Sequence, residues 1–441
     1  MQTSSRRRAR TVGERFLGLL GDLGEDGLGL EDAEPSWLRD YRSDALASLR
    51  EHGLPTRKTE GWRVTPLRTV VATDYRISKA TEIESSVEAG AGQVILSNGR
   101  LVACGSLPDG VSLRPLSQVI ANRDERLGEL WSKAPESLKG FAALNALRFE
   151  EGWVLVVEEG CQVESPITFE HRVEAAEATV SYPRALLVLE EGASCTVIER
   201  FSGSPEAQHL SDEVIQVYVA EKASLRHTRM YFGSGQRAHC SHLEVQVAGG
   251  GDYKLGSYML GGSLTRSDIV VRLVGERATV ELDGLFLAAD EELVDHHVRV
   301  EHHASRAQSN QTFRGVVTGR GHAVFDGIIE VKRDAQQTDA HMQNRNLLLS
   351  DRATLHTKPH LEIDADDVAC SHGATVGALD DDQLFYLRAR GIPEADAKAI
   401  LTYAFVEELV ARAPAEHVRD ALRDAVLGWL PEGHLVRGIL A

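Results

Sequence analysis

The sequence has few cysteines, and none of them lies close to another. The five are Cys104, Cys161, Cys195, Cys240 and Cys370, and no C-x-x-C pair occurs. An odd, unclustered set is typical of a reducing compartment rather than of a disulfide framework. It also excludes a four-cysteine zinc or iron–sulfur site built from one segment. A metal bound here would need ligands from distant segments or from another chain.

Long apolar runs and a surplus of basic charge are also missing. No run reaches the roughly 18–20 apolar residues of a membrane-spanning helix. The net charge of -18 at pH 7 argues against nucleic acid and anionic membranes as partners, since both are bound through clustered Lys and Arg. The basic start, Arg6–Arg10, precedes no apolar segment, so we interpret it as a tail, with an organelle transit peptide as the alternative. We expect a cytoplasmic protein.

Motifs for nucleotide binding and hydrolysis are absent as well. The sequence has no P-loop, no G-x-G-x-x-G after a strand, no G-x-S-x-G turn and no H-E-x-x-H pair. Without a glycine loop to hold phosphates, we expect no ATP on this chain.

Three regions differ in their hydrophobic pattern. Residues 1–150 are predicted to be helical or irregular, with one helix whose apolar stripe contains Leu38, Tyr41, Ala45 and Leu49. Residues 151–376 consist of short alternating runs rich in Val, Ile, Leu and Thr, which predict an all-β unit. Residues 377–441 are helical again.

A weak repeat runs through the β region. A strand followed by a tight polar turn that ends in alanine recurs at Ala193, Ala223, Ala278, Ala323 and Ala353, which are 30, 55, 45 and 30 residues apart. These intervals are close to multiples of about 15, and such a period indicates stacked supersecondary units. We therefore expect a β-helix or related β-solenoid, with a β-sandwich or jelly roll as the alternative.

The C-terminal region predicts three amphipathic helices. The first is capped by Asp381 or Asp382 and ends at Gly391, the second has Pro393 at its first turn, and the third begins at Pro414. The second has an apolar stripe that contains Ala397, Ile400, Leu401, Ala404, Phe405 and Leu409. These helices can cover the open end of a solenoid or form a docking module, and the pattern does not separate the two.

The densest cluster of potential ligands is the segment 295–303, Asp-His-His-Val-Arg-Val-Glu-His-His. On a strand, alternation puts His297, Arg299, Glu301 and His303 on one face. Histidine and carboxylate can bind a divalent metal. Because Arg299 would repel a cation, we favour an exposed polar ladder over a metal site.

Cys370 and His372 form a smaller but sharper pattern. Residues two apart on a strand point the same way, so thiol and imidazole share a face. A thiolate and a neutral imidazole are good ligands for soft metals, and a neighbouring imidazolium lowers the pKa of a thiol. The alternatives are a buried cysteine beside a hydrogen-bonded histidine, or a nucleophile pair that lacks an orienting residue.

Longer segments around this pair resemble the C-terminal signature of the SufB/SufD family. They are residues 343–350 (QNRNLLLS), 358–377 (KPHLEIDADDVACSHGATVG) and 380–393 (DDDQLFYLRARGIP). Weaker matches occur at residues 55–68 and 141–145. The resemblance covers most of the chain from about residue 50 onward, although Gly61 and Val64 depart from the family pattern in the first N-terminal motif.

The resemblance implies a fold and a branch of the family. The fold is a right-handed parallel β-helix flanked by N-terminal and C-terminal α-helical domains, with boundaries near residues 150 and 376. Ala353 stands where the SufB branch has a cluster-assembly cysteine, and Gly373 stands where it has a glutamate. Both differences favour the SufD branch, which is a non-catalytic scaffold for iron–sulfur cluster assembly and not an enzyme.

The resemblance also implies partners. The β-helix would pair with SufB, and the C-terminal helices would bind the ATPase SufC, while sulfur arrives indirectly from a cysteine desulfurase system. Flavin affinity belongs to the whole complex, and a homodimer is the alternative state of the isolated chain. The residues expected near the ATPase are aromatic or apolar and lie in the helical region: Leu384, Phe385, Tyr386, Tyr403 and Phe405.

For the cluster itself, the resemblance implies that iron enters at the SufB–SufD interface. His372 would supply a ligand there and Cys370 would assist. One rival is a β-helix enzyme acting on polysaccharide, with Asp364 and Asp366 on one face of a strand as paired carboxylates. Another is a structural solenoid that polymerises end to end, which helices covering both ends would oppose.

Overall fold

The structure is a computed structural model. It describes residues 34–68, 70, 73–78, 88–124, 128, 130–131, 138–174, 177–204 and 206–440. The basic segment Arg6–Arg10 lies outside them. Within the described residues, no helix combines the length and hydrophobicity needed to span a membrane.

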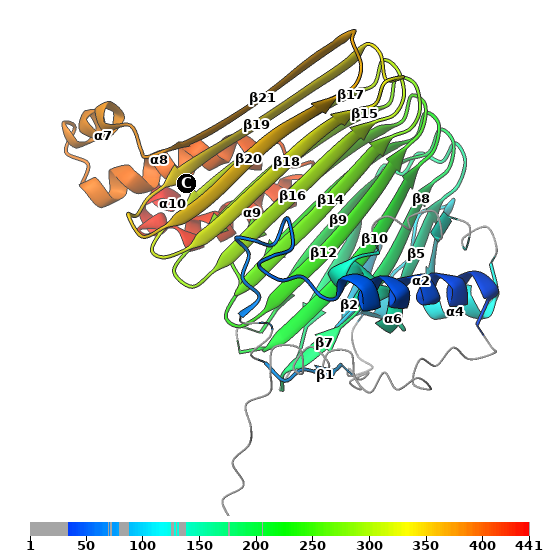
Figure 1. Ribbon diagram of the computed structural model, residues 1–441. Helices are drawn as coiled ribbons and strands as arrows, with labels where there is room; N and C mark the ends of the chain where they lie inside the picture. The colour runs from blue at the N-terminus through cyan, green and yellow to red at the C-terminus, as the bar shows by residue number, and fades with distance from the viewer. Residues whose placement is uncertain are drawn as a thin grey trace, which may run out of the picture.

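The centre of the molecule is a parallel β-solenoid in which the chain passes alternately through two facing sheets (Figure 1). The first sheet has 11 strands. From the last strand back they are β20 (Thr354–Ile363), β18 (His322–Val331), β16 (Leu293–His302), β14 (Leu264–Leu273), β12 (Ala238–Val247), β10 (His209–Val219), β8 (Arg184–Leu189), β5 (Gly152–Val157) and β4 (Val111–Pro115), with β7 (Thr179–Ser181) beside β10 and β1 (Arg76–Ile77) beside β7.

The second sheet has 10 strands. In the same direction they are β21 (Val368–Gly377), β19 (Thr338–Leu348), β17 (Gln308–Val317), β15 (Thr279–Ala288), β13 (Asp252–Leu260), β11 (Ser224–Phe232), β9 (Ser194–Gly203), β6 (Ile167–Val173), β2 (Gln93–Ser97) and β3 (Arg100–Cys104). The prediction of a β-solenoid is confirmed, and the sandwich and jelly-roll alternatives are wrong.

The alanine repeat marks the turns of the solenoid. The amide N–H groups of Ala193, Ala223, Ala278 and Ala353 each donate to the carbonyl three residues earlier, which closes a tight turn. One full turn takes about 30 residues, since Ser224 pairs with Ser194. The interval of about 15 in the sequence is therefore one strand with its turn.

Apolar side chains at every second position fill the space between the sheets. On β10 the inward residues include Ile215, Val217 and Val219, and the next strand continues the stack with Leu243 and Val245. A single turn cannot by itself bury the β-branched and aliphatic side chains of its two inner faces. The turns therefore stabilise one another by stacking.

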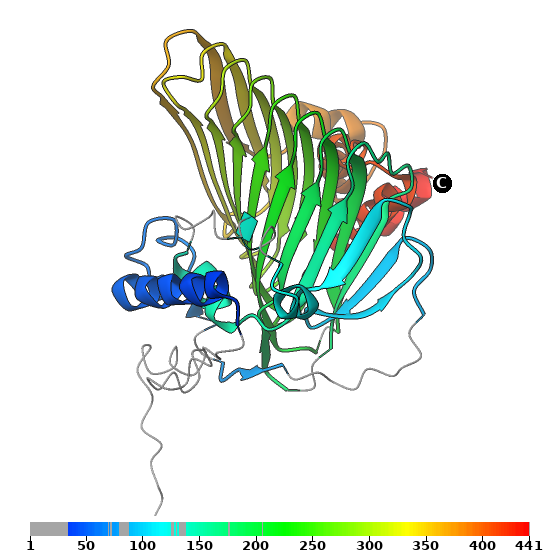
Figure 2. The ribbon, with the colours of Figure 1, turned by 90° about the vertical axis from the view of Figure 1, so that its right-hand side faces the viewer.

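Helices cover the two outer faces. The first sheet is covered by α2 (Ser36–His52), α4 (Leu116–Ala121) and α6 (Gly140–Arg148). The second sheet is covered by α8 (Glu394–Val410) and α9 (Glu416–Trp429), with α7 (Asp381–Arg388) and α10 (Gly433–Leu440) alongside. Figure 2 shows α2 and the C-terminal helices on opposite sides of the solenoid. The capping alternative is therefore wrong, because these helices pack on a flank and not over an end.

Several details differ from the sequence predictions. Strands β1 to β4 lie in the region predicted to be helical or irregular, and β2, β3 and β4 extend both sheets. The side chain that caps α7 is that of Asp380, which accepts from the N–H groups of Asp382 and Gln383. Pro393 is the N-cap of α8, α9 begins at Glu416, and a fourth helix, α10, follows.

The apolar stripe assigned to the second C-terminal helix is also partly wrong. Ala397 and Leu409 are buried as expected, but Ala404 is exposed and Tyr403 and Val406 are buried instead. This helix is apolar around much of its circumference, so periodicity does not identify the face that meets the sheet.

Candidate functional site

The last turn of the solenoid ends in two long bare strands. β20 and β21 are the outermost strands of the two sheets, and each has one strand neighbour in its sheet. Each is ten residues long and mostly exposed. In Figure 1 no helix lies along the outer edge of either strand. A long exposed edge presents a row of N–H and C=O groups to another chain, so this edge is a candidate interface.

Cys370 and His372 lie on β21 and point to the same side, as predicted. They pair with Ala340 and Met342 of β19, which face the solenoid interior. Cys370 is half-buried and packs against this interior, whereas His372 is exposed. Within the described residues, the His372 imidazole has no hydrogen bond or ion pair. The alternative of a hydrogen-bonded structural histidine is therefore wrong.

The electrostatics of Cys370 differ from the expectation. Burial and the nearby Asp339 carboxylate raise the pKa of the Cys370 thiol, against a weaker opposing effect of a backbone hydrogen bond with Ala340. No lowering by an imidazolium is found. Because a metal ligand must be a thiolate, metal binding at Cys370 would release a proton.

A polar layer lies directly inside this edge. Thr357 of β20 donates to Asn344 Oδ1 at 2.8 Å, and Asn346 Nδ2 donates to the same oxygen at 2.5 Å and to the Thr375 carbonyl at 3.1 Å. These bonds connect β19 to both edge strands. The backbone that carries Cys370 and His372 is therefore held in place from within.

On the outward side of the same edge, two histidine side chains form local hydrogen bonds and ion pairs. His341 contacts Ser371 Oγ at 2.6 Å and Asp339 at 2.8 Å, and His360 contacts Glu362 at 3.4 Å. His372 thus differs from His341 and His360 in having no such partner in the described part of the chain, whereas the ring of His356 on β20 lies against the His322 ring.

Other sequence positions fall near this edge without forming a second site. Asp364 and Asp366 lie in the loop between β20 and β21 and not on a strand, so the alternation argument for a carboxylate pair is wrong. Ala353 lies in the turn before β20, and Gly373 is in the middle of β21 with open space around it.

The histidine-rich segment forms a polar ladder of paired charges, as favoured, but on β16 its outward residues are half-buried or buried and not exposed. On β16, His296, Val298, Val300 and His302 are buried, and the alternate residues face outward. Arg299 pairs with Glu330 at 2.7 Å on the neighbouring strand. The remaining outward pairs also use neighbouring charges: His297 with Asp295, and Glu301 with Arg272 and His303. With their charges paired, these residues offer no open ligand set.

A buried charge cluster inside the solenoid was missed by the sequence analysis. Potential ligand atoms of His171, Glu199 and Glu213 lie within 4.8 Å of one another. Arg229 links the two carboxylates, donating to Glu199 at 2.8 Å and to Glu213 at 2.5 Å. Because the guanidinium already neutralises both carboxylates, we interpret this cluster as a structural ion-pair network and not as a metal site.

The network holds both glutamates ionised. Burial opposes ionisation of Glu199, but Arg229 and hydrogen bonds from His171 and His227 outweigh it and hold the pKa of Glu199 well below its ordinary value. Burial also opposes ionisation of Glu213, but Arg229 and His239 outweigh this effect and lower the pKa of Glu213 to about 2. Two buried carboxylates thus depend on one buried cation.

The expected ATPase-contact residues fall into two groups. Phe385 and Tyr386 on α7 are 73% and 55% exposed, and Leu384 beside them is half-buried. Tyr403 is buried against the second sheet, and Phe405 is half-buried beneath the Arg314 guanidinium. The exposed aromatic pair is therefore on α7.

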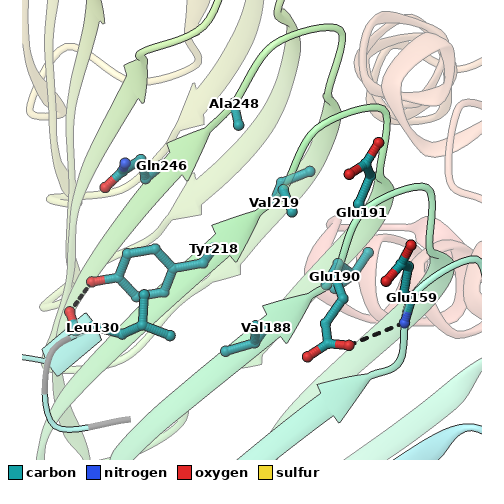
Figure 3. A pocket seen from close by; sticks show the side chains of 11 residues that line it. Leu130, Glu159, Val188, Glu190, Glu191, Tyr218, Val219, Gln246 and Ala248 are labelled. Carbon is teal, nitrogen blue, oxygen red and sulfur yellow. Dashed lines mark hydrogen bonds between the residues drawn. The ribbon is translucent and has the colours of Figure 1, made fainter. Parts of the chain in front are cut away.

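A cavity of about 530 Å³ lies on the outer face of the first sheet (Figure 3). Val188 and Tyr218 lie on neighbouring strands β8 and β10 at its floor, and the Tyr218 hydroxyl donates to the Leu130 carbonyl. Glu159, Glu190 and Glu191 come from the turns at its rim. It has no cysteine or histidine in its lining, so it does not extend the edge site.

The sequence is similar to known proteins over most of its length. The model of the SUF system FeS cluster assembly, SufBD core domain, matches residues 171–405. The chain is 33% identical over 400 residues to the iron–sulfur cluster assembly protein SufD of Escherichia coli, covering 88% of this chain and 92% of that protein. It is 30% identical over 434 residues to the chloroplastic protein ABCI7 of Arabidopsis thaliana, covering 94% and 91%.

Proposed function

The chain belongs to the SufB/SufD family of iron–sulfur cluster assembly proteins, and from this we propose that it is a SufD-type scaffold that holds part of a nascent cluster at the open edge of its solenoid. The observation that carries the proposal is an unpartnered, exposed His372 beside Cys370 on a bare ten-residue edge strand. The chain acts by binding and positioning, without catalytic residues of its own.

The edge strands supply the partner contact. An extended strand from another chain can add to β20 or β21, because backbone groups there lack a neighbour on one side. The favoured partner is SufB, whose own solenoid would continue the sheets. In its absence, a second copy of this chain fits the same edge. The free cysteines of the described chain agree with a reducing cytoplasmic location.

The ligands suit a cargo that must leave again. Iron would enter between the two chains, where the neutral imidazole of His372 offers a nitrogen and Cys370 a sulfur after loss of its proton. Two ligands from one chain bind weakly, and SufB would complete the set. The inner layer of Asn344, Asn346 and Thr357 fixes the strand, so ligand release depends on separation of the chains and not on unfolding of β21.

Helix α7 supplies a second contact, with the ATPase SufC. Exposed aromatic side chains are typical anchors of protein interfaces, and Phe385 and Tyr386 project from α7 next to the end of β21. Closure of two ATPase subunits would then pull on a helix that directly follows the edge strand. Leu384, Tyr403 and Phe405 would support α7 and α8 and would not touch the partner.

The proposal is tested by complementation in a strain that lacks the gene. Replacement of His372 by alanine should abolish growth that depends on this assembly system, and should lower the iron and sulfide content of the purified complex. His360→Ala is the matched control, since His360 is an exposed edge histidine on β20 that faces outward. Normal cluster assembly by the His372→Ala protein would rule out the ligand role.

The partner assignment has its own test. Val376 is exposed near the end of β21, and Val376→Lys places a charge in the expected interface. Co-expression should then recover this chain without SufB, while the purified protein remains folded. Undiminished co-purification with SufB would place the interface elsewhere.

A further inference from the structure

The two N-terminal segments marked by the sequence analysis meet on the outer face of the first sheet. In the first segment, the Trp62 ring lies over the Arg266 guanidinium, 3.8 Å from the ring centroid, and Thr65 donates to Asp295 at 2.5 Å. The second segment begins α6, and its Phe141 ring is 5.4 Å from the Trp62 ring. The first segment reaches the open edge through an ion pair of Glu60 with Lys358 of β20 at 4.0 Å. Among the described residues, neither segment forms a hydrogen bond or ion pair with Cys370 or His372, so their arrangement needs a separate explanation.

A cavity of about 450 Å³ lies where these segments meet the sheet. Its walls come from the end of α2, the loop that follows, the start of α6, and strands β10, β12 and β14. Its lining includes Trp62, Lys139, Phe141, Ala142, Asp212 and Asp268.

Asp212 in this lining has an unsatisfied oxygen. The residue is 1% exposed, and its Oδ2 has no hydrogen-bond partner. A buried polar atom without a partner costs about 1–3 kcal/mol. Such an atom in the wall of a cavity indicates that a group from outside the chain completes the hydrogen bond.

The start of α6 adds donors to the same cavity. Helix α6 has no side-chain cap at Lys139, and among described residues no acceptor is found for the N–H groups of Gly140, Phe141 and Ala142. The first N–H groups of a helix and its dipole favour an anion. Lys139 lies at the mouth with the same sign of charge.

Of the three acidic residues of the lining, Glu51 has a largely exposed side chain, and the other two do not cancel this preference. The Asp268 carboxylate is held by two hydrogen bonds from Arg266, at 2.9 and 2.6 Å. Burial raises the pKa of Asp212 well above its ordinary value, against the opposing effect of Arg184. This direction favours the protonated form of Asp212, whose hydroxyl group can donate a hydrogen bond.

From this arrangement we infer that the cavity binds a small organic anion. Its carboxylate or phosphate group would lie against the N-terminus of α6 and accept a hydrogen bond from Asp212. Its apolar part would contact Trp62 and Phe141. This site is distinct from the edge site, and its occupancy does not depend on the role proposed for His372.

Calorimetry on the full-length protein tests the inference, with benzoate and phenyl phosphate as probes. Saturable binding of both is expected, and benzyl alcohol, which has the ring without the charge, should bind at least about tenfold more weakly. Equal affinity for benzyl alcohol, or no saturable binding of either anion, would overturn the anion assignment.

Variants place the ligand in the cavity. Ala142→Leu fills the space beside the helix start and should abolish binding, with folding checked by circular dichroism. Asp212→Asn keeps a donor and should retain binding within about threefold, whereas Asp212→Leu should lose it. Lys139→Gln should weaken binding several-fold more than Lys58→Gln, a matched change outside the lining. Equal binding by the Asn and Leu variants, or full binding by Ala142→Leu, would exclude this cavity.

Discussion

The interior charge cluster and the open edge use similar side chains in opposite ways. Inside the solenoid, Glu199 accepts hydrogen bonds from His171, His227 and Arg229. At the edge, His372 has no partner in the described chain. A histidine in a saturated network contributes to one fixed structure. One without partners costs little when exposed, and it is available to a metal or another chain.

Burial explains why the two regions cannot exchange roles. An ionised group inside the solenoid without its partner would be unstable, so every member of the interior cluster is fixed by the others. The edge is solvated, and water satisfies its groups until a partner arrives. Substitutions should therefore affect stability in the interior and assembly at the edge.

The largest effect should follow removal of the interior cation. Arg229→Met leaves Glu199 and Glu213 buried without compensation and should lower the free energy of unfolding by about 3–5 kcal/mol. Urea denaturation measures this. Arg226→Met is the matched control, because Arg226 lies on the same strand but is exposed. Equal destabilisation by both changes would show that the buried ion-pair network contributes no more to the free energy of unfolding than an exposed arginine does.

The next effect concerns the exposed aromatic pair on α7. Phe385→Ala combined with Tyr386→Ala should weaken binding of the ATPase by about 2 kcal/mol or more, roughly 30-fold, because interface aromatics dominate binding energy. Titration calorimetry with the purified partner gives the value. Val274→Ala, an exposed apolar residue in a solenoid turn, should leave the affinity unchanged. An unchanged affinity in the α7 variant would contradict the docking assignment.

A smaller effect should appear in the pH dependence of stability. Burial lowers the pKa of His296 to about 3, against a raising effect of Asp295. Below pH 6.5 the unfolded chain gains a proton at this position and the folded chain does not, so the stability present above pH 6.5 decreases as pH falls toward 3.

His296→Gln keeps a hydrogen-bonding group near Ser257, which contacts His296 at 3.0 Å. It should reduce the loss of stability between pH 6.5 and 5 by about 1–2 kcal/mol. Unfolding measured in urea at several pH values tests this. An identical pH slope in wild type and variant would mean that the pKa of His296 is the same in the folded and unfolded chain.

The smallest stability effect should be at the edge itself. His372→Ala should change the free energy of unfolding by less than about 0.5 kcal/mol, since the side chain is exposed and unpartnered. The same melting experiment on His360→Ala provides the comparison. A large destabilisation by His372→Ala would remove the contrast between edge and interior.

Much of the fold could be predicted because the solenoid repeats. The alanine turns gave half of the period, and the full turn of about 30 residues places Glu199 beside Arg229. The interior ion pair was therefore within reach of the sequence once the period was doubled. Glu213 was not, because it comes from the opposite sheet and its approach depends on how the two inner faces meet.

The predictions that failed depended on tertiary contacts. The face of α8 that meets the sheet is chosen by complementarity with β13, β15 and β17, and an all-round apolar helix gives no signal for it. The cavity at Asp212 needs five distant segments to converge. The exposure of His372 could not be known either, since the Cys-Ser-His spacing fixes only which face the residues share.

The two ends of the solenoid are unlike, and this limits the size of any assembly. At the first end, β3 and β4 are five residues long and run antiparallel to their neighbours. At the other end, β20 and β21 are ten residues long and parallel to theirs. A head-to-tail contact would join unequal ends, whereas a tail-to-tail contact joins matching ones and leaves no second long edge exposed. A tail-to-tail pair would therefore be closed at two chains and would have no second long edge for growth into a fibre.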